Sequence, residues 1–510
     1  MAVVKLRFTR LQAPARAGHL SMGRPPLGMI IAMGRGSRAP GPGHLPAASG
    51  LLTDLYELNM AASYLRRGML EQATFSLFAR RLPERRGFLV AAGLADCLDF
   101  LEAFGFSDDD LAYARDELGF EDRDLEAFRR LRFTGDVWAV PEGRAVLAEE
   151  PLLEVTAPIA EAQLVETVLL NLVTFQTTIA SKASRCRIAA RGRELVDFAF
   201  RRTQGLEAGL AVGRLSAMVG FQATSNVEAA RRFGLRTTGT MAHSYIEAFP
   251  NESAAFAAFA DDFPDRTTFL VDTYDTMDGV RAAIALVLER DLAGPSGVRL
   301  DSGDLGDLAR RARAALDRAG LQRVRIVASG GLDELDIDDL VRTGAPIDVF
   351  GVGTRMGVSA DHPYLDTVYK LVQVGDRPVM KLSPGKATAP GPKQVFRGEP
   401  LTDVIGLRDE PAPAGSEPLL VPVMAGGRRL EPPEPLERAR RRFEADLARL
   451  PDEALDLRVP RAPQPELSEA LRRLGEETRR ELSARLAAAR LSAGTDRLPG
   501  PGHVRLPWRE

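Results

Sequence analysis

The side chains with the clearest chemical potential lie in short motifs that each follow an apolar run. His243 lies in GTMAHSY at residues 239–245, and it is one of five histidines in the chain. A histidine can act as a general base or as a phosphoryl acceptor. The alternative is a structural histidine with no chemical role. The neighbouring motifs therefore decide how His243 is interpreted.

The stretch RLDSGDLGD at residues 299–307 combines a cation, Arg299, with several acids. Carboxylates can hold magnesium and sugar hydroxyls, and they can also cap the start of a helix. We assign the functional role to Asp301, which directly follows the apolar run. Asp304 and Asp307 are expected to begin a helix.

Two glycine-rich turns indicate an anion site. They contain Ser329, Gly330 and Gly331 in one unit, and Gly351, Gly353 and Thr354 in the next. Glycines allow backbone N–H groups to approach an anion, and the N-terminus of a following helix is partly positive. The alternative is that these glycines only form tight turns. Two such turns in consecutive units favour phosphate binding.

The elements that must position these motifs alternate between short apolar strands and amphipathic helices. The predicted strands are RELVDFAF, MVGFQAT, RTTGTMA, TTFLVDTYD, GVRLDSG, RVRIVASGG and IDVFGVGT, from residue 193 to residue 354. This alternation predicts a parallel sheet, as an irregular βα (TIM-like) barrel or as an open doubly wound sheet. The number of units and the lack of an early G-x-G-x-x-G favour the barrel.

In a βα barrel, functional side chains gather after the C-terminal ends of the strands. The side chains expected there are Phe198, Arg201, Arg202, Thr240, His243, Ser244, Asp272, Asp275, Arg299, Asp301 and Ser302. Together with the glycine-rich turns, they predict a phosphorylated small substrate, a divalent metal and a histidine near both.

The predicted domains follow from the change of pattern along the chain. Residues 1–49 carry seven Lys or Arg and no acid, and we expect a disordered extension or an assigned start that is too early. A second, discontinuous α+β domain is expected to combine an N-terminal segment with strands that follow the barrel. The predicted ranges are 50–165 for the N-terminal part, 166–372 for the barrel, 373–460 for the post-barrel part and 461–510 for a C-terminal helix and tail.

The composition excludes several classes of protein. Apolar residues make up 45% and charged residues 27%, and the net charge is −3. Without a basic field, neither nucleic acid nor a membrane surface is an expected partner. Cys97 and Cys186 form no disulfide framework and no zinc spacing, and a cytoplasmic location is expected. No apolar run approaches the roughly 20 residues of a membrane helix.

Taken together, the motifs resemble the nicotinate phosphoribosyltransferase family of class II phosphoribosyltransferases. The matching stretches run in the family's order from Leu51 to about Arg397. They are LLTDLYELNMAASYLRRG, FSLFARRLPERRGFLVAAGL, LVDFAFRRTQG, GFQATSNVEAA, GTMAHSY, VDTYDTMDGV, VRLDSGDL, FGVGTRMGVS, VYKLV and KLSPGK.

The resemblance implies a specific reaction. The family transfers the 5-phosphoribosyl group of phosphoribosyl pyrophosphate to nicotinate, forming nicotinate mononucleotide and pyrophosphate in NAD biosynthesis. Magnesium is required and is held mainly through pyrophosphate, with Asp301 as a candidate ligand. ATP hydrolysis is coupled through a phosphorylated histidine, and His243 is the matching residue.

The resemblance also implies roles for individual residues. Tyr56, Thr240 and Arg299 match nicotinate contacts, and Phe198 matches an aromatic that stacks on the pyridine ring opposite Tyr56. Tyr56 and Asp54 come from the partner subunit in the family, which implies a homodimer with shared active sites. The remaining expected substrate contacts are Arg201, Ser329, Gly330, Gly331, Gly351, Gly353 and Thr354. Lys381, Lys386 and Lys393 lie in a matching loop without an assigned ligand.

Two alternatives remain at this point. A related pyridine phosphoribosyltransferase would use nicotinamide or quinolinate. Enzymes that use nicotinamide are expected to present an acid near Ser225 or Asn226, where this chain is neutral, and quinolinate enzymes are shorter and lack the histidine. A catalytically silent nucleotide-binding barrel is the other alternative, and losing His243, Arg299 or Asp301 would have been its signature.

Overall fold

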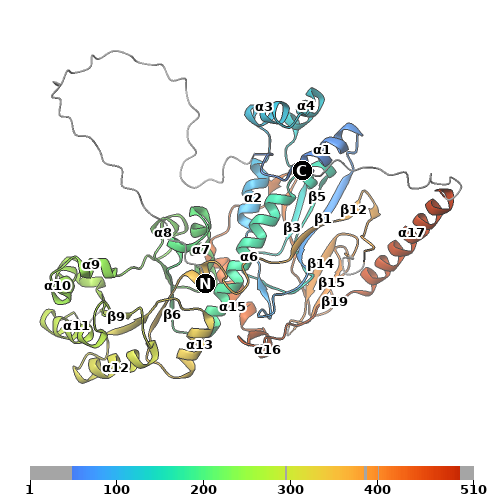
Figure 1. The fold of residues 1–510 in the computed structure, drawn as a ribbon. Coiled ribbons are helices and arrows are strands. Elements are labelled where there is room, and N and C mark those ends of the chain that lie inside the picture. Colours follow the sequence, from blue (N-terminus) through green and yellow to red (C-terminus); the bar gives the residue numbers. More distant parts are fainter. Residues whose placement is uncertain (1–48, 293–295, 384–387, 400, 494–510) are drawn as a thin grey trace, which may run out of the picture. The chain divides into compact units, whose positions relative to one another are not determined.

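The computed structural model describes residues 49–292, 296–383, 388–399 and 401–493. The predictions for residues 1–48, for Lys386 and for the tail from residue 494 onward lie outside the described residues. Figure 1 shows the arrangement of the described elements. In this part of the chain, no helix is both long enough and apolar enough to cross a membrane.

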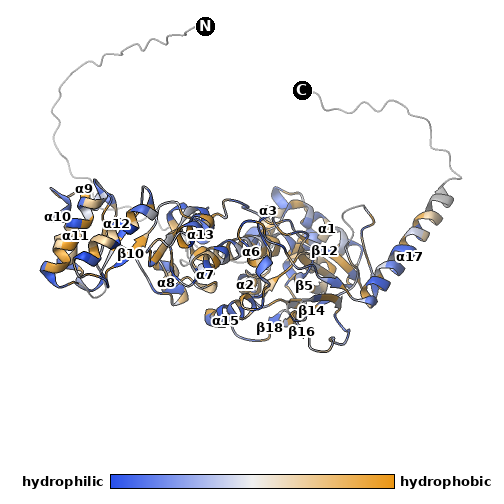
Figure 2. Ribbon diagram, turned by 90° about the horizontal axis from the view of Figure 1, so that it is seen from below, coloured by the Kyte–Doolittle hydropathy of each residue, from blue (hydrophilic) through white to orange (hydrophobic). Residues whose placement is uncertain are grey.

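A parallel sheet carries most of the predicted motifs. Its strand order is β7 (Ala223–Thr224), β6 (Glu194–Asp197), β11 (Val349–Val352), β10 (Arg325–Ala328), β9 (Gly297–Leu300) and β8 (Thr268–Leu270). All pairings between neighbours are parallel. The middle strands are hydrophobic, as Figure 2 shows for β10, and Val298, Ile326 and Phe350 are buried. This is the pattern of a parallel sheet that helices cover.

Helices connect these strands, and several begin with a side-chain cap directly after a strand. Asp275, Asp304 and Asp333 accept hydrogen bonds from backbone N–H groups in the first turns of α11, α12 and α13. Asp304 therefore has its predicted helix-start role. The helices of this region are α7 (Leu206–Met218), α8 (Val227–Phe233), α9 (His243–Glu247), α10 (Glu252–Asp262), α11 (Thr276–Arg290), α12 (Leu305–Arg318), α13 (Glu334–Arg342) and α14 (Thr354–Gly357), with 3-10 turns at Phe200–Arg202 and Pro264–Arg266.

One predicted strand is absent, and this bears on the closure of the barrel. The segment predicted as a strand at 236–240 forms a single parallel bridge between Thr224 and Thr237. The chain then leaves β7, and the Thr240 side chain contacts the Arg299 guanidinium instead. Among the described residues, no ladder joins this segment to β8. The parallel sheet is thus confirmed, whereas a closed TIM-like barrel is not.

A second, antiparallel sheet combines distant segments of the chain. Its strand order is β13 (Arg377–Pro378), β12 (Thr367–Val374), β1 (Gln72–Ala79), β5 (Pro151–Pro158), β3 (Asp136–Ala139), β17 (Val421–Ala425) and β18 (Arg428–Arg429). Strands that follow the parallel sheet therefore extend a sheet begun near residue 72. The predicted barrel limit at 372 cuts through β12, which pairs with β1 from Thr367 to Val374. The boundary belongs before β12.

Smaller sheets and further helices complete the described chain. The strands are β2 (Leu89–Val90) with β4 (Ala145–Val146), and β16 (Glu417–Pro418), β14 (Lys393–Arg397), β15 (Asp403–Leu407) and β19 (Glu466–Leu467). The helices are α1 (Leu55–Arg66), α2 (Leu94–Ala103), α3 (Asp108–Asp116), α4 (Asp122–Arg130), α5 (Ile159–Leu164), α6 (Glu166–Ala189), α15 (Leu436–Leu447), α16 (Asp452–Leu455) and α17 (Glu469–Ala493). The α6 helix contacts β2 and β12 and also α7 and α13, so it packs against elements of both regions.

A buried charge cluster joins the end of β14 to its neighbours. The Arg397 guanidinium is fully buried and lies 2.6 Å from Asp403 Oδ2 and 3.1 Å from Asp446 Oδ2. Glu150, also fully buried, has its Oε2 atom 3.9 Å from the same guanidinium. Arg144 Nε lies 2.9 Å from Asp446. Removing one partner from such a cluster strongly destabilises a fold, because it leaves an uncompensated buried charge.

Candidate active site

Arg299 joins three loops at the C-terminal ends of the parallel strands. Its Nε donates to Ser329 Oγ at 2.8 Å, its Nη1 to Thr240 Oγ1 at 2.9 Å, and its Nη2 to Asp301 Oδ1 at 2.6 Å. The side chain is 12% exposed. The guanidinium is therefore held in one orientation, and its charge is only partly screened by water.

Asp301 is fixed at the end of β9 by hydrogen bonds to its side chain and its backbone. Ser329 Oγ donates to Asp301 Oδ1 at 2.5 Å, and the Asp301 backbone N–H donates to Asp272 Oδ2 at 3.0 Å. Burial alone would raise the pKa of Asp301, but hydrogen bonds from Ser329 and Arg299 hold the pKa below its ordinary value. Asp301 is thus an oriented carboxylate at neutral pH.

His243 lies in the same neighbourhood, as the first residue of α9. Its Nδ1 atom is 3.1 Å from Thr273 Oγ1, on the loop that follows β8. The His243 side chain is half-buried, and Thr273 is adjacent to Asp272, which accepts a hydrogen bond from the Asp301 backbone. The structure therefore brings His243, Arg299, Asp301 and Thr240 together, as the sequence predicts.

Phe198 lies beside Arg299, and its ring accounts for the glycine at position 351. The Arg299 Cζ atom is 5.6 Å from the centre of the Phe198 ring, within the range of a cation–π contact. A Cβ atom on Gly351 would lie 2.6 Å from the Phe198 ring. Gly351 is therefore required for packing of the aromatic ring, whatever its part in binding an anion.

The other predicted turn has a similar packing requirement. Gly330 has φ +95°, and a Cβ atom there would lie 1.8 Å from the Asp301 carbonyl oxygen. Gly331 has φ +75° with open space around the position of a Cβ atom. Arg355, next to Thr354, donates to Asp333 at 3.3 Å and so links the two turns. Phosphate binding by the two turns remains a prediction.

Other predicted residues are not part of this group. Tyr56 and Asp54 are exposed at the start of α1, which contacts α4 and α5. Arg201 is exposed in the 3-10 turn after β6. None of these three residues has a side-chain hydrogen bond to Arg299, Asp301 or His243 among the described residues.

The lysines without an assigned ligand differ in their surroundings. Lys393 is buried in β14, where its Nζ donates to the Ala389 and Gly391 carbonyl oxygens and lies 3.5 Å from Glu154. These contacts occupy its ammonium group, so Lys393 has a structural role. Lys381 is exposed after β13.

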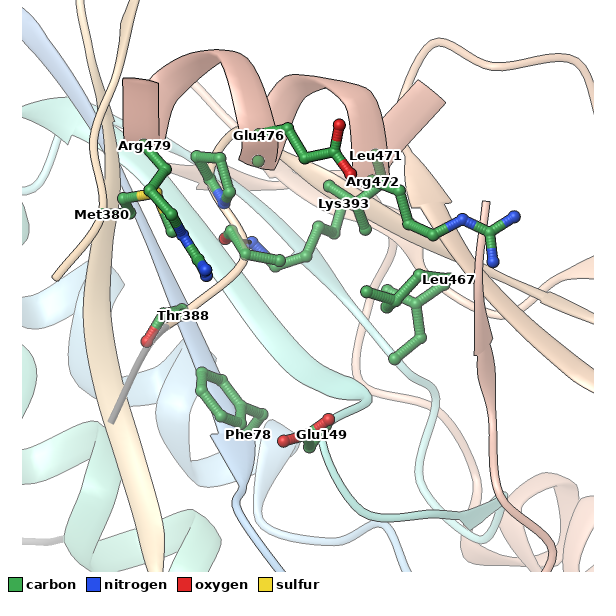
Figure 3. Close-up of a pocket in the computed structure, with 14 residues that line it drawn as sticks. Phe78, Glu149, Met380, Thr388, Lys393, Leu467, Leu471, Arg472, Glu476 and Arg479 are labelled. Atoms are coloured by element: carbon green, nitrogen blue, oxygen red, sulfur yellow. Dashed lines mark hydrogen bonds between the residues drawn. The ribbon is translucent and has the colours of Figure 1, made fainter. Parts of the chain in front are cut away.

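A cavity of about 370 Å³ lies elsewhere, between α17 and the β14–β15 strands (Figure 3). Phe78, Ile405 and Leu467 give it apolar walls, and Arg479 reaches from α17 toward Thr388. None of the residues predicted to bind substrate lines it. It is distinct from the strand ends that carry Arg299 and Asp301.

Sequence reasoning did not single out Thr273, which contacts His243, or Glu252, which lies near Asp272 and Asp275. Thr273 lies beside Asp272 near the end of the predicted strand TTFLVDTYD, so the rule of strand ends could have identified it. Glu252, the first residue of α10, gives no such signal because an acid is usual at a helix start. Burial, followed by the charges of Asp272 and Asp275, raises the pKa of Glu252 to about 7.

Among the described residues, no group of three or more His, Cys, Asp or Glu side chains is placed to hold a metal ion. One buried oxygen near Asp301 is nevertheless free, because Asp272 Oδ1 has no hydrogen-bond partner in this part of the chain. Magnesium often uses one or two carboxylates together with substrate phosphates. Asp272 and Asp301 fit such a shared site.

Comparisons with known proteins assign the chain's segments to one family. Residues 51–174 match the nicotinate phosphoribosyltransferase (NAPRTase) N-terminal domain, and residues 193–399 match the NAPRTase family. The chain is 47% identical over 413 residues to nicotinate phosphoribosyltransferase pncB2 of Mycobacterium tuberculosis, covering 80% of this chain and 89% of the relative. It is 44% identical to the Bacillus subtilis nicotinate phosphoribosyltransferase, covering 68% and 72%.

The structural comparison agrees with the sequence comparisons. The crystal structure of human nicotinic acid phosphoribosyltransferase matches with a TM-score of 0.73 and 32% identity, covering 83% of this chain and 99% of the human chain. A nicotinate-nucleotide pyrophosphorylase from Pyrococcus furiosus shares the fold, with a TM-score of 0.66 and 24% identity. The family domains, the sequence relatives and the human structure all point to the same family. The chain belongs to the nicotinate phosphoribosyltransferase family.

Proposed function

We propose that this protein transfers the 5-phosphoribosyl group of phosphoribosyl pyrophosphate to the ring nitrogen of nicotinate, releasing pyrophosphate and forming nicotinate mononucleotide for NAD biosynthesis. The observation that carries this proposal is the Arg299 guanidinium, oriented by Thr240, Ser329 and Asp301 beside the Phe198 ring. A partly buried guanidinium suits a carboxylate ligand, and the aromatic ring suits the pyridine.

The Asp301 side chain would face the ribose and pyrophosphate, and the turns at Gly330 and Gly353 would receive the phosphate. Magnesium, bound with pyrophosphate, would neutralise the charge of the leaving group. Asp301 is ionised at neutral pH because Ser329 and Arg299 lower its pKa, and Asp272 offers an unpaired oxygen beside it. These two carboxylates are the residues that would hold the metal.

ATP coupling through His243 is the second part of the proposal. The imidazole is half-buried near Asp301 and has one ring nitrogen in contact with Thr273. A phosphoryl group on His243 would therefore lie beside the substrate site, where it can influence binding of phosphoribosyl pyrophosphate and release of pyrophosphate.

A homodimer with shared active sites is the third part. Tyr56 is 49% exposed, although it matches a residue expected to cover the pyridine ring. Placing Tyr56 of one protomer over Phe198 of its partner would resolve this exposure.

The test is steady-state formation of nicotinate mononucleotide, with and without ATP, by purified full-length protein. Nicotinamide and quinolinate serve as competing substrates. The proposal expects turnover of nicotinate that rises with ATP, and preferential turnover of either competing base would contradict the proposed substrate.

A further inference from the structure

Asp197, the last residue of β6, has a buried carboxyl group that is held from two sides. Its Oδ1 atom accepts a hydrogen bond from the Ala199 backbone N–H at 2.9 Å, and its Oδ2 atom accepts one from the Thr224 hydroxyl at 2.6 Å. Burial raises the pKa of Asp197, and these hydrogen bonds act in the opposite direction. Because a buried carboxylate depends on its hydrogen-bond donors, the two donors determine where it lies.

The first of these hydrogen bonds closes a turn with Phe198 at its centre. In an Asx turn, the side chain of one residue accepts from the backbone N–H two residues later, which restricts the residue between them. The Phe198 backbone N–H also donates to the Val352 carbonyl oxygen at 2.8 Å. The backbone of the aromatic residue beside Arg299 is thereby held on both sides.

Thr224, the last residue of β7, forms a similar turn around Ser225. Its Oγ1 atom accepts a hydrogen bond from the Asn226 backbone N–H at 3.0 Å. The Ser225 backbone N–H donates to the Asp197 carbonyl oxygen at 2.8 Å. The exposed Ser225 side chain therefore projects from a turn that Asp197 holds through both its side chain and its backbone.

We propose that Asp197 is a positioning residue that sets the spacing between Phe198 and Ser225. It thereby fixes the distance between the ring that stacks on the pyridine and the position expected to distinguish a carboxylate from an amide. This inference rests on the proposed binding of nicotinate against Phe198. The Thr224 hydroxyl is the connecting group, because it closes one turn and donates to the carboxylate that closes the other. Without this hydroxyl, the turn around Ser225 loses its closing hydrogen bond, whereas the turn around Phe198 keeps its own.

The first experiment measures steady-state kinetics of the full-length enzyme with each substrate varied in turn. Thr224→Val removes the hydroxyl, and the KM for nicotinate should rise about fivefold to tenfold, the effect of one hydrogen bond to a charged group. Thr224→Ala, which places no methyl group against the carboxylate, should show the same rise. The KM for phosphoribosyl pyrophosphate should stay near the wild-type value, because the proposed phosphate turns follow β10 and β11.

Two further variants serve as controls for these kinetics. Thr224→Ser keeps the hydroxyl and should restore the KM for nicotinate to within about twofold of wild type. Thr478→Val is the matched control on α17, where a buried threonine hydroxyl donates to the Leu474 carbonyl oxygen at 2.8 Å. It should change neither KM. A wild-type KM for nicotinate in Thr224→Val and Thr224→Ala, or equal rises in both KM values, would overturn the role of Asp197.

The second measurement is a double-mutant cycle, which a purely structural role of Asp197 would not move. The loss of kcat/KM for nicotinate caused by Ser225→Asp should be about threefold or more smaller in the Thr224→Val background, because residue 225 is no longer held at the pyridine. Additive effects would overturn the inference, as would a Ser225→Asp change without effect in the wild type. Absence of nicotinate turnover by the wild type would instead contradict the proposed function.

Discussion

The Arg299 guanidinium donates to the Thr240 hydroxyl at 2.9 Å across 59 residues of sequence. The contact connects the end of β9 with the loop that leads to His243. The position of the guanidinium therefore depends on two loops. Binding of a ligand carboxylate should depend on the orientation of the guanidinium as well as on its positive charge.

Replacing Arg299 with lysine tests this geometry. Lysine keeps the positive charge and loses the planar fork that reaches Thr240, Ser329 and a ligand carboxylate together. Loss of charge-assisted hydrogen bonds of about 1.5–3 kcal/mol should raise the KM for nicotinate roughly tenfold or more. Arg281→Lys is the control, because Arg281 is an exposed residue on α11 that pairs with Asp278. An unchanged KM for nicotinate in Arg299→Lys would remove Arg299 from the site.

His243→Ala should abolish stimulation by ATP while slow ATP-independent transfer remains, because other residues form the proposed ribosyl site. Mass spectrometry after incubation with ATP should detect an acid-labile phosphoryl group on the wild type only. His362→Ala is the control, since His362 stacks on Tyr364 and has no side-chain hydrogen bond to Arg299, Asp301 or Thr273 among the described residues. An equal adduct on His243→Ala would show that another residue is phosphorylated.

Ser225 is a candidate determinant of substrate choice, because its side chain is exposed directly after β7. The neighbouring Asn226 amide is occupied, since it caps α8 and donates to the Gly209 carbonyl. Ser225→Asp should lower kcat/KM for nicotinate about tenfold, through repulsion between carboxylates that is only partly screened. Ser225→Asn controls for size. Equal kcat/KM values in Ser225→Asp and Ser225→Asn would place this residue outside the pyridine site.

The shared site can be tested with Tyr56→Ala, in which one ring of the proposed stack is missing. An aromatic pair contributes about 0.5–1.5 kcal/mol beyond area burial, and with the buried area also lost, the KM for nicotinate should rise about tenfold. The KM for phosphoribosyl pyrophosphate should change less. Steady-state kinetics with each substrate varied in turn would measure both constants.

Mixing Tyr56→Ala protein with His243→Ala protein then distinguishes sites that are shared between two protomers from sites that lie within one protomer. In a twofold dimer with sites built across the interface, random exchange would restore up to about a quarter of the sites. Exchange is verified separately with differently tagged chains. Proven exchange without recovery would mean that Tyr56 and His243 serve the same protomer's site.

The buried cluster around Arg397 gives a prediction about stability and pH. Burial, with the nearby Asp403 carboxylate, raises the pKa of Glu150 well above its ordinary value. The folded protein then binds more protons than the unfolded chain, so this contribution is complete at low pH and is lost as pH rises toward the folded pKa. Glu150→Gln mimics the protonated carboxyl. The free energy of unfolding of this variant should therefore fall less steeply with pH than that of wild type, by up to about 1.4 kcal/mol per pH unit.

Urea unfolding of Glu150→Gln and wild type between about pH 5 and 8 would measure this difference, since a raised folded pKa makes the two curves diverge there. Asp452→Asn, a change on the short α16 helix, serves as the control for a neutralised exposed acid. Parallel curves for Glu150→Gln and wild type would show that Glu150 is ionised in the fold.

The sequence predicted much of the parallel sheet, because its strands are short apolar runs that end in polar residues. Arg299, Asp301 and His243 were identified in this way, and Asp304 was recognised as a helix start. The strand predicted at 236–240 was wrong, since a run of threonines has strand propensity but the segment gains only one bridge. The contacts of Thr273 and the pKa of Glu252 depend on loops that meet only in the fold, so local patterns could not predict them.

The order of strands in the antiparallel sheet has a consequence for synthesis on the ribosome. The central strands β1, β5 and β3 are made early, whereas both flanks, β12 with β13 and β17 with β18, follow the whole parallel sheet. Ala73 of β1 cannot pair with Val374 of β12 until the intervening chain has been translated. Both edges of the central strands can therefore pair with other chains during that interval. The order of synthesis thus leaves the open edges of β1 and β3 as the part of the N-terminal sheet most exposed to wrong pairing.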